Sequence, residues 1–185
     1  MRKLYVFSLL FFVALSVAVG NAAPFVGSID FQGLTDGEDV GNFYQSLGIT
    51  FTGFTAVAGH YYTCLGTQET CSASVGFGAV MDVQPGFQNA LSFYFNQGGS
   101  GEVLLYDGLG GTGTLLADAA LGQAMSEWEP FGFTFPGLAK SAVFNGNMEV
   151  AVVTMGGGFV IPEPATVVLL LSGLATVASF RRRLR

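Results

Sequence analysis

Few side chains in this chain of 185 residues have the chemistry of an active site. His60 is the only histidine, so a Ser-His-Asp triad would have to use it, and no serine lies in the glycine-flanked turn that exposes a nucleophile. The two carboxyl groups of a glycosidase can lie anywhere in a sequence. Glu127 and Glu129 flank Trp128, the only tryptophan, which could stack on a sugar. Because such a tryptophan is more often a strand-edge or core residue, we expect no enzymatic activity.

Acidic residues gather in one polar loop, at Asp36, Glu38 and Asp39. Calcium binds hard oxygen ligands of this kind on loops. The spacing is not that of an EF-hand, and carboxylates on an acidic surface are mostly solvated. We therefore expect no cofactor and no metal, and a structural calcium ion at this loop is the alternative.

The glycines Gly108, Gly110 and Gly113 fit the G-x-G-x-x-G pattern of dinucleotide-binding proteins. A nucleotide site of that type needs a helix beginning at the third glycine. Residues 114–122 are too few for such a helix, and strand-like sequence follows them. The pattern predicts a glycine-rich β-turn.

Two cysteines occur, Cys64 and Cys71. In an exported chain an even number of cysteines favours a disulfide, which would close a loop of six residues. Zinc would need further soft ligands, and a redox motif would need two intervening residues. We expect a Cys64–Cys71 disulfide that holds a local loop.

Between its two ends the chain reads as β-structure almost throughout. Runs of β-branched and aromatic residues alternate with glycine-rich breaks, as in all-β sandwiches. Phe131, Phe133 and Phe135 would share one face of a strand. A helix of two turns at most is indicated at 40–47. We predict an all-β, antiparallel, jelly-roll-like β-sandwich over residues 24–158, with strands at 26–31, 49–57, 77–83, 90–95, 102–106, 114–119, 131–135, 141–144 and 150–155.

Charge is distributed very unevenly along the chain. Six of its seven basic residues lie in the two ends, and Lys140 alone lies in the body. Twelve of the thirteen acidic residues also lie in the body, so its net charge is about −11, against −6 for the whole chain. Nucleic-acid binding depends on lysine and arginine contacts to phosphate, so this composition excludes it.

The N-terminal end has the three regions of a secretory signal peptide. Arg2 and Lys3 precede an apolar run over 4–19, and small residues lead to a cleavage site between Ala22 and Ala23. We predict a signal-peptide helix within residues 1–22, with an uncleaved N-terminal anchor as the alternative.

The C-terminal end combines a short motif, an apolar run and a basic cluster. Pro162, Glu163 and Pro164 precede the uncharged residues 165–180. As a helix this run would be about 24 Å long, which is short for a membrane of about 30 Å. The positive-inside rule keeps the basic cluster cytoplasmic and places everything before the motif outside. We predict a sorting signal over 161–185 with a transmembrane helix at 165–180 and, as its cytoplasmic end, Arg181, Arg182, Arg183 and Arg185.

The sequence of residues 161–166, the apolar segment and the arginine cluster together resemble the PEP-CTERM sorting signal of Gram-negative bacteria. The resemblance implies recognition by an exosortase, a membrane enzyme that cuts near Pro162–Pro164, and only transient residence in the inner membrane. It also implies an association with exopolysaccharide and biofilm. A simple stop-transfer anchor is the alternative for the tail.

The body over 28–154 is also similar to the β-sandwich ectodomains common in PEP-CTERM proteins. The resemblance rests on residues 29–31, 40–44, 47–51, 90–95 and 105–108. Residues 150–155 lack the acidic or amide pair of those domains, which weakens a calcium site at Asp30. We expect a noncatalytic surface or matrix protein in the cell envelope. The alternative is a carbohydrate-binding module that uses Trp128, Tyr61 and Tyr62.

Overall fold

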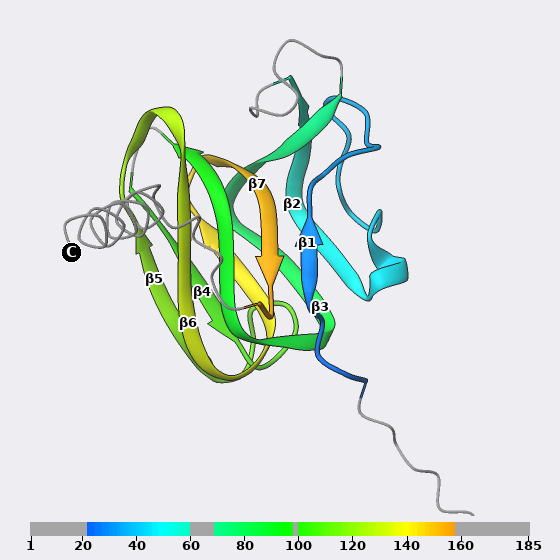
Figure 1. Ribbon diagram of the computed structural model, residues 1–185, viewed down its shortest axis with the longest axis vertical. Helices are drawn as coiled ribbons and strands as arrows, with labels where there is room; N and C mark the ends of the chain where they lie inside the picture. Colours follow the sequence, from blue (N-terminus) through cyan, green and yellow to red (C-terminus); the bar gives the residue numbers. More distant parts are fainter. Residues whose placement is uncertain (1–21, 60–68, 98–99, 158–185) are drawn as a thin grey trace, which may run out of the picture.

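The computed structural model describes residues 22–59, 69–97 and 100–157 (Figure 1). Every strand pairing in this part of the chain is antiparallel. The predicted all-β antiparallel fold is therefore confirmed. The elements in chain order are β1 (Gly27–Ile29), the 3₁₀ helix η1 (Gln45–Leu47), β2 (Ile49–Ala58), β3 (Thr70–Gln97), β4 (Gly101–Tyr106), β5 (Leu115–Leu121), β6 (Ala124–Asn145) and β7 (Met148–Met155).

The helix expected at 40–47 is reduced to η1, a single 3₁₀ turn. Gly48 ends it in the left-handed conformation with φ 74°, and the Gly48 N–H donates to the Gln45 carbonyl. Glycine adopts this conformation without a steric penalty, so the chain can turn directly into β2. Within the described residues, no helix is long and apolar enough to cross a membrane, and the segment predicted to do so, 165–180, lies outside them.

Seven strands replace the nine expected, because β3 and β6 each take up two predicted strands. β3 has 28 residues and β6 has 22. Their pairing register shifts between Asp82 and Phe87, around Pro85 and Gly86. Proline and glycine inside a strand mark a bulge or bend. The turn signals that divided these strands in the sequence are therefore bends within continuous strands.

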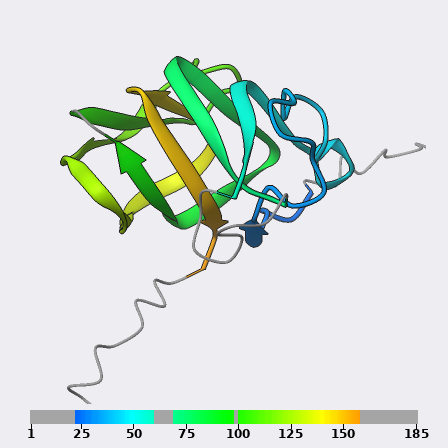
Figure 2. The ribbon, with the colours of Figure 1, turned by 90° about the horizontal axis from the view of Figure 1, so that it is seen from above.

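These bends produce two layers from one sheet (Figure 1). In one layer β2, the first half of β3, the second half of β6, β4 and β5 are neighbours. In the other layer β1, β7, the second half of β3 and the first half of β6 are neighbours. Val150 at the start of β7 pairs with both Ala73 and Phe95, so both halves of β3 flank β7 there. Figure 2 shows β7, β3 and β2 running side by side.

The core between the layers is built from aromatic and aliphatic side chains. Phe54 and Phe144 are in edge-to-face contact with ring centroids 5.4 Å apart, and Phe93 contacts Phe144 at 5.6 Å. The predicted alternation in β6 is confirmed, since Phe131, Phe133 and Phe135 all pack against this core. The sandwich is therefore held together mainly by the burial of large apolar side chains.

The chain enters and leaves this domain at one place. Gly27 in β1 pairs with Met155 in β7, and the Gly156 N–H donates to the Ala90 carbonyl at 3.1 Å. On the N-terminal side, the Phe25 N–H donates to the Gly86 carbonyl at 2.7 Å. Both ends of the described domain are thus fixed side by side, at the lower end of the domain in Figure 1.

Candidate functional site

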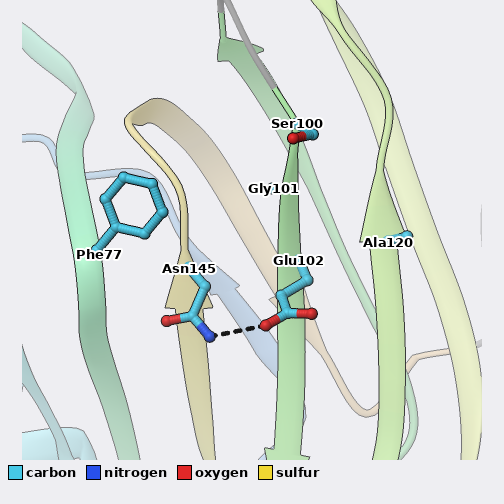
Figure 3. Close-up of a pocket in the computed structure, with 6 residues that line it drawn as sticks. All are labelled: Phe77, Ser100, Gly101, Glu102, Ala120 and Asn145. Atoms are coloured by element: carbon cyan, nitrogen blue, oxygen red, sulfur yellow. Dashed lines mark hydrogen bonds between the residues drawn. The ribbon is translucent and has the colours of Figure 1, made fainter.

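An open groove lies on the outer face of the first layer, across four strands. Glu102 in β4 pairs with Asn145 in β6 on one side and with Ala120 in β5 on the other. Paired residues on adjacent strands point to the same face, so their three side chains form one row. The inward-facing neighbours Val103 and Phe144 are buried in the core. The groove has a volume of about 350 Å³ and is lined by Phe77, Ser100, Gly101, Glu102, Ala120 and Asn145 (Figure 3).

Phe77 is the most exposed large hydrophobic side chain in the described domain, at 73 %. The pairing of β2 with β3 jumps from Thr52–Val80 to Phe54–Val75, so that Gly53 alone stands opposite residues 76–79. This is a large irregular bulge with four residues opposite one, and glycines on both sides of Phe77 permit it, with Gly78 at φ 73°. The bulge carries Phe77 out of the alternation that buries its neighbours and presents the ring to solvent beside the groove (Figure 3).

A polar network fixes the centre of the groove. Asn145 Nδ2 donates to Glu102 Oε1 at 2.9 Å, and the Gly78 N–H donates to Asn145 Oδ1 at 3.1 Å (Figure 3). Asn145 thus joins the bulge that carries Phe77 to the strand that carries Glu102. The second carboxylate oxygen of Glu102 and the second Nδ2 hydrogen of Asn145 have no protein partner among the described residues.

The groove combines an aromatic face with hydrogen-bonding groups in fixed positions. Sites for small polar ligands typically have this composition, since apolar contacts supply area and a few polar groups supply orientation. Glu102 is the only acidic residue that lines the groove, so the two carboxyl groups of a glycosidase are not present among its lining residues. The groove therefore has the composition of a site for a small polar ligand.

The glycine-rich segment after β4 is a turn, as predicted. β5 follows it where a nucleotide site would need a helix. The turn lies against the same outer face as the groove: the Gly110 N–H donates to Asp82 Oδ1 at 2.6 Å, and the Gly111 N–H to Ser141 Oγ at 3.0 Å. Ser141 Oγ in turn donates to the Gly108 carbonyl at 2.6 Å, which satisfies a fully buried hydroxyl.

Asp107 closes this turn. Its Oδ1 accepts a hydrogen bond of 2.6 Å from the Thr114 N–H. The hydrogen bonds from Thr114 hold the pKa of the Asp107 carboxyl below its ordinary value, and the nearby positive charge of Lys140 acts in the same direction. The ionised form of Asp107 is therefore part of the turn's structure.

The acidic loop considered for calcium forms backbone caps. Glu38 Oε2 accepts from the Thr35 N–H at 2.7 Å, Asp36 Oδ1 from the Ala58 N–H at 2.9 Å, and Asp39 Oδ1 from the Gly41 N–H at 3.2 Å. In the described part of the chain, no group of three or more acidic, histidine or cysteine side chains could hold a metal ion. These bonds hold the loop along β2, where the Val40 N–H donates to the Phe54 carbonyl.

Asp30, the other residue considered for calcium, accepts a hydrogen bond from the Gln32 N–H at 3.2 Å. Its negative charge also acts on Tyr44. Burial raises the pKa of Tyr44 to about 12, with a further contribution from Asp30. The Phe31 backbone offsets part of this rise, but the Tyr44 hydroxyl has no hydrogen-bond partner among the described residues.

Trp128 does not form the exposed stacking surface considered from the sequence. It lies in β6, is only 8 % exposed, and packs with Cys71 and Ala151 in a small second cluster. Tyr94 and Val152 pack against that cluster. The view of this tryptophan as a core residue is therefore the correct one. Its neighbour Glu129 is exposed, and the side chain of Glu127 lies outside the described part of the structure.

Several residues singled out in the sequence lie outside the described part of the chain. They are His60, Tyr61, Tyr62, Cys64, Pro162, Glu163, Pro164, Arg181, Arg182, Arg183 and Arg185. Ala22 and Ala23 are described and are exposed ahead of β1. Cys71 is buried at 2 % exposure near the start of β3.

The residues of the groove were missed from the sequence. The sequence pattern predicts a regular strand at Phe77, and Glu102 and Asn145 are 43 positions apart, so nothing local joins them. One signal was available: an aromatic residue between two glycines inside a strand-like run indicates a bulge. The pairing of β4 with β6 could not be read from the sequence.

Comparison with known proteins gives a match for the tail and distant structural likenesses for the body. A search of the curated proteins finds no match to this chain. Among solved structures, CsCBM6-3 from Clostridium stercorarium in complex with cellobiose has a TM-score of 0.49 and 12 % identity, over 76 % of this chain and 100 % of its own. A mutant of CBM29-2, a family 29 carbohydrate-binding module, has a TM-score of 0.43 and 16 % identity, over 75 % and 96 %.

The C-terminal CBM6 of LamC, a laminarinase from Zobellia galactanivorans, has a TM-score of 0.38 and 12 % identity, over 58 % of this chain and 90 % of its own.

The family description that matches the chain is the PEP-CTERM protein-sorting motif, at residues 160–183. This range contains the Pro-Glu-Pro sequence, the apolar run and the first arginines. The chain therefore carries a PEP-CTERM protein-sorting motif, which implies export and processing by an exosortase.

Proposed function

We propose that this protein is a noncatalytic component of the cell surface or extracellular matrix, delivered there by an exosortase-type system and associated with exopolysaccharide. The sorting motif at 160–183 carries this proposal. The chain then divides into a signal peptide at 1–22 with cleavage between Ala22 and Ala23, a β-sandwich ectodomain at 24–158 and a sorting signal at 161–185. Within the sorting signal, residues 162–164 are recognised and 165–180 cross the inner membrane transiently, while Arg181, Arg182, Arg183 and Arg185 stay cytoplasmic.

The arrangement of the two ends of the domain supports this division. The chain enters β1 and leaves β7 side by side, through the Gly27–Met155 pairing. A signal peptide and a sorting tail would therefore hold the same end of the domain toward the membrane. The rest of the sandwich would extend away from it.

A disulfide between Cys64 and Cys71 is part of the proposal. Cys71 is buried and is not a free thiol, and an exported protein folds in an oxidising compartment. The bridge would hold the segment before β3 against the small cluster that contains Trp128.

Mass spectrometry of the mature protein tests the sorting proposal. Protein from a host with an exosortase should begin at Ala23 and end near Pro162–Pro164, whereas an isogenic strain without the exosortase should yield chains that end at Arg185. The double substitution Pro162→Ala and Glu163→Ala should have the same effect as loss of the enzyme. A mature chain that ends at Arg185 in the competent host would make the tail a simple anchor.

A second function, carbohydrate binding, is supported by a specific observation. Phe77 is 73 % exposed on a bulge whose position is fixed through Asn145 to Glu102. A ring this exposed contributes little burial to the fold, and a polar network beside it suits a ligand that offers both an apolar face and hydroxyl groups.

Affinity electrophoresis of the mature protein in gels that contain polysaccharide tests this second function. Phe77→Ala should abolish retardation, whereas Phe43→Ala should not. Phe43 is a suitable control because it is another exposed phenylalanine and is not among the residues that line the groove. Equal retardation of the Phe77→Ala and Phe43→Ala variants would show that the groove does not bind the polysaccharide.

A further inference from the structure

We infer that the groove at Phe77 selects neutral polysaccharide chains over acidic ones. This inference rests on the proposed carbohydrate binding and specifies its ligand. Three features carry it: the charge at the groove, the hydrogen-bonding groups left open there, and the direction of the row of lining residues.

The charge at the groove is negative and is not compensated by a basic residue. Glu102 lies at its centre, and no lysine or arginine lines it. The only basic residue in the described domain is Lys140, which lies beside Asp107 at the glycine-rich turn. A uronate or sulfate group brought against Glu102 would meet a like charge with no cation nearby, and such repulsion is an effective means of rejecting a ligand.

The hydrogen-bonding groups in the groove match neutral hydroxyls. An ionised Glu102 can only accept hydrogen bonds, and its Oε2 remains open, while Asn145 can donate its second Nδ2 hydrogen. The third polar side chain, Ser100, can both donate and accept. An acceptor beside a donor suits neighbouring sugar hydroxyls, which both donate and accept. The apolar C–H face of the sugar ring would lie on Phe77.

The lining residues run across the sheet, from Phe77 on β3 through Asn145 on β6 and Glu102 on β4 to Ala120 on β5 (Figure 3). Neighbouring strands are about 4.8 Å apart, so three strand spacings give about 14 Å. This is the length of an oligosaccharide rather than of a single sugar. The groove is a surface depression, so a polymer could pass through it without offering a chain end.

The position of the groove also favours a polymer outside the cell. Asn145 lies just before β7, whereas the chain leaves the domain after Met155 at the other end of that strand. The seven residue steps of β7 correspond to about 24 Å. Before the tail is removed, with both ends of the domain directed toward the membrane, the groove would lie at the end of the domain away from the lipid surface.

The test compares four polysaccharides with the mature protein in affinity electrophoresis: glucomannan and a β-glucan, which are neutral, and polygalacturonate and alginate, which are acidic. We expect retardation by at least one neutral polymer, unchanged by added salt because no charge pairing is involved, and at least ten-fold weaker or no retardation by the acidic ones. Glu102→Gln keeps the acceptor for Asn145 and removes the charge. It should reduce discrimination against the acidic polymers by at least several fold while far-UV circular dichroism stays unchanged.

The outcomes separate the inference from the function on which it rests. If none of the four polymers retards the unsubstituted protein, the proposed carbohydrate binding fails, and this inference fails with it. If acidic and neutral polymers retard it equally, or if Glu102→Gln leaves discrimination unchanged, carbohydrate binding stands and the selection by charge is wrong.

Discussion

Asn145 and Glu102 are joined across strands β6 and β4 by a hydrogen bond of 2.9 Å from Nδ2 to Oε1. The same amide accepts a hydrogen bond from the Gly78 N–H through Oδ1. One side chain therefore orders both the carboxylate and the bulge that holds Phe77. Asn145 positions the groove.

Replacing Asn145 with alanine should loosen the groove and destabilise the fold. The substitution removes the part-buried donor to Glu102 and the exposed acceptor for the Gly78 N–H, and each lost hydrogen bond costs about 1 kcal/mol or less. We expect the free energy of unfolding in urea to fall by about 1–2 kcal/mol. Retardation in gels that contain a neutral polysaccharide should also fall, because the bulge that carries Phe77 loses its link to Glu102.

Asn147→Ala is the matched control for Asn145→Ala, because Asn147 is an exposed asparagine in the turn that joins β6 to β7. Its unfolding midpoint and its retardation should match those of the unsubstituted protein. If both variants behaved alike, the two hydrogen bonds of Asn145 would not hold the groove.

Trp128 should report on folding and should not take part in binding. It is the only tryptophan and lies buried against Cys71 and Ala151, so its fluorescence should resist quenching by iodide until the protein unfolds. Trp128→Ala should lower the free energy of unfolding by about 3–5 kcal/mol, because it leaves a cavity. Trp128→Phe should lower it less and should leave polysaccharide retardation unchanged. If the Trp128→Phe protein were folded but no longer retarded by polysaccharide, Trp128 would be part of the binding surface.

The strand segments could be predicted from the sequence because they follow from local pattern. Phe131, Phe133 and Phe135 alternate with exposed residues, as a period of two requires. The continuity of β3 and β6 could not be predicted. Pro85 and Gly86 are ordinary turn signals, and only the pairing of residues on either side with β6 makes them a bend inside one strand.

The residues of the groove could not be predicted from the sequence for a related reason. Glu102 and Asn145 become neighbours through the register of β4 on β6, which is a long-range property. Trp128 was conspicuous because it is unique, but its burial depends on Ala151 from another strand. The sorting tail was predictable because its motif, apolar run and arginines are contiguous.

The Asp107 turn predicts a specific dependence of stability on pH. The folded-state pKa of Asp107 is lowered by the hydrogen bonds from Thr114, so its contribution is present above the unfolded pKa of about 3.9 and is lost as pH falls through the folded value. Asp107→Asn removes that contribution. Urea unfolding at several pH values between 7 and 3 should show a smaller loss of stability at the acid end for Asp107→Asn than for the unsubstituted protein.

Asp118→Asn is the control for this experiment. Asp118 is an exposed aspartate on β5, and this substitution changes the net charge by the same amount as Asp107→Asn. We expect its stability to follow that of the unsubstituted protein as the pH falls. Parallel curves for Asp107→Asn and the unsubstituted protein would show that the turn does not depend on the ionised carboxyl.

The junction at Gly156 should be the most sensitive point where the two ends of the domain meet. Gly156 has φ 76°, and a Cβ there would lie 2.6 Å from the Phe25 carbonyl oxygen, whereas a Cβ at Gly157 would meet nothing within 4 Å. Gly156→Ala should therefore displace residues 25–26, weaken the β1–β7 pairing and speed proteolytic removal of the N-terminal residues, while Gly157→Ala should not. N-terminal analysis of fragments during limited proteolysis measures this. Equal cleavage rates in the two variants would mean that the junction does not hold β1 in place.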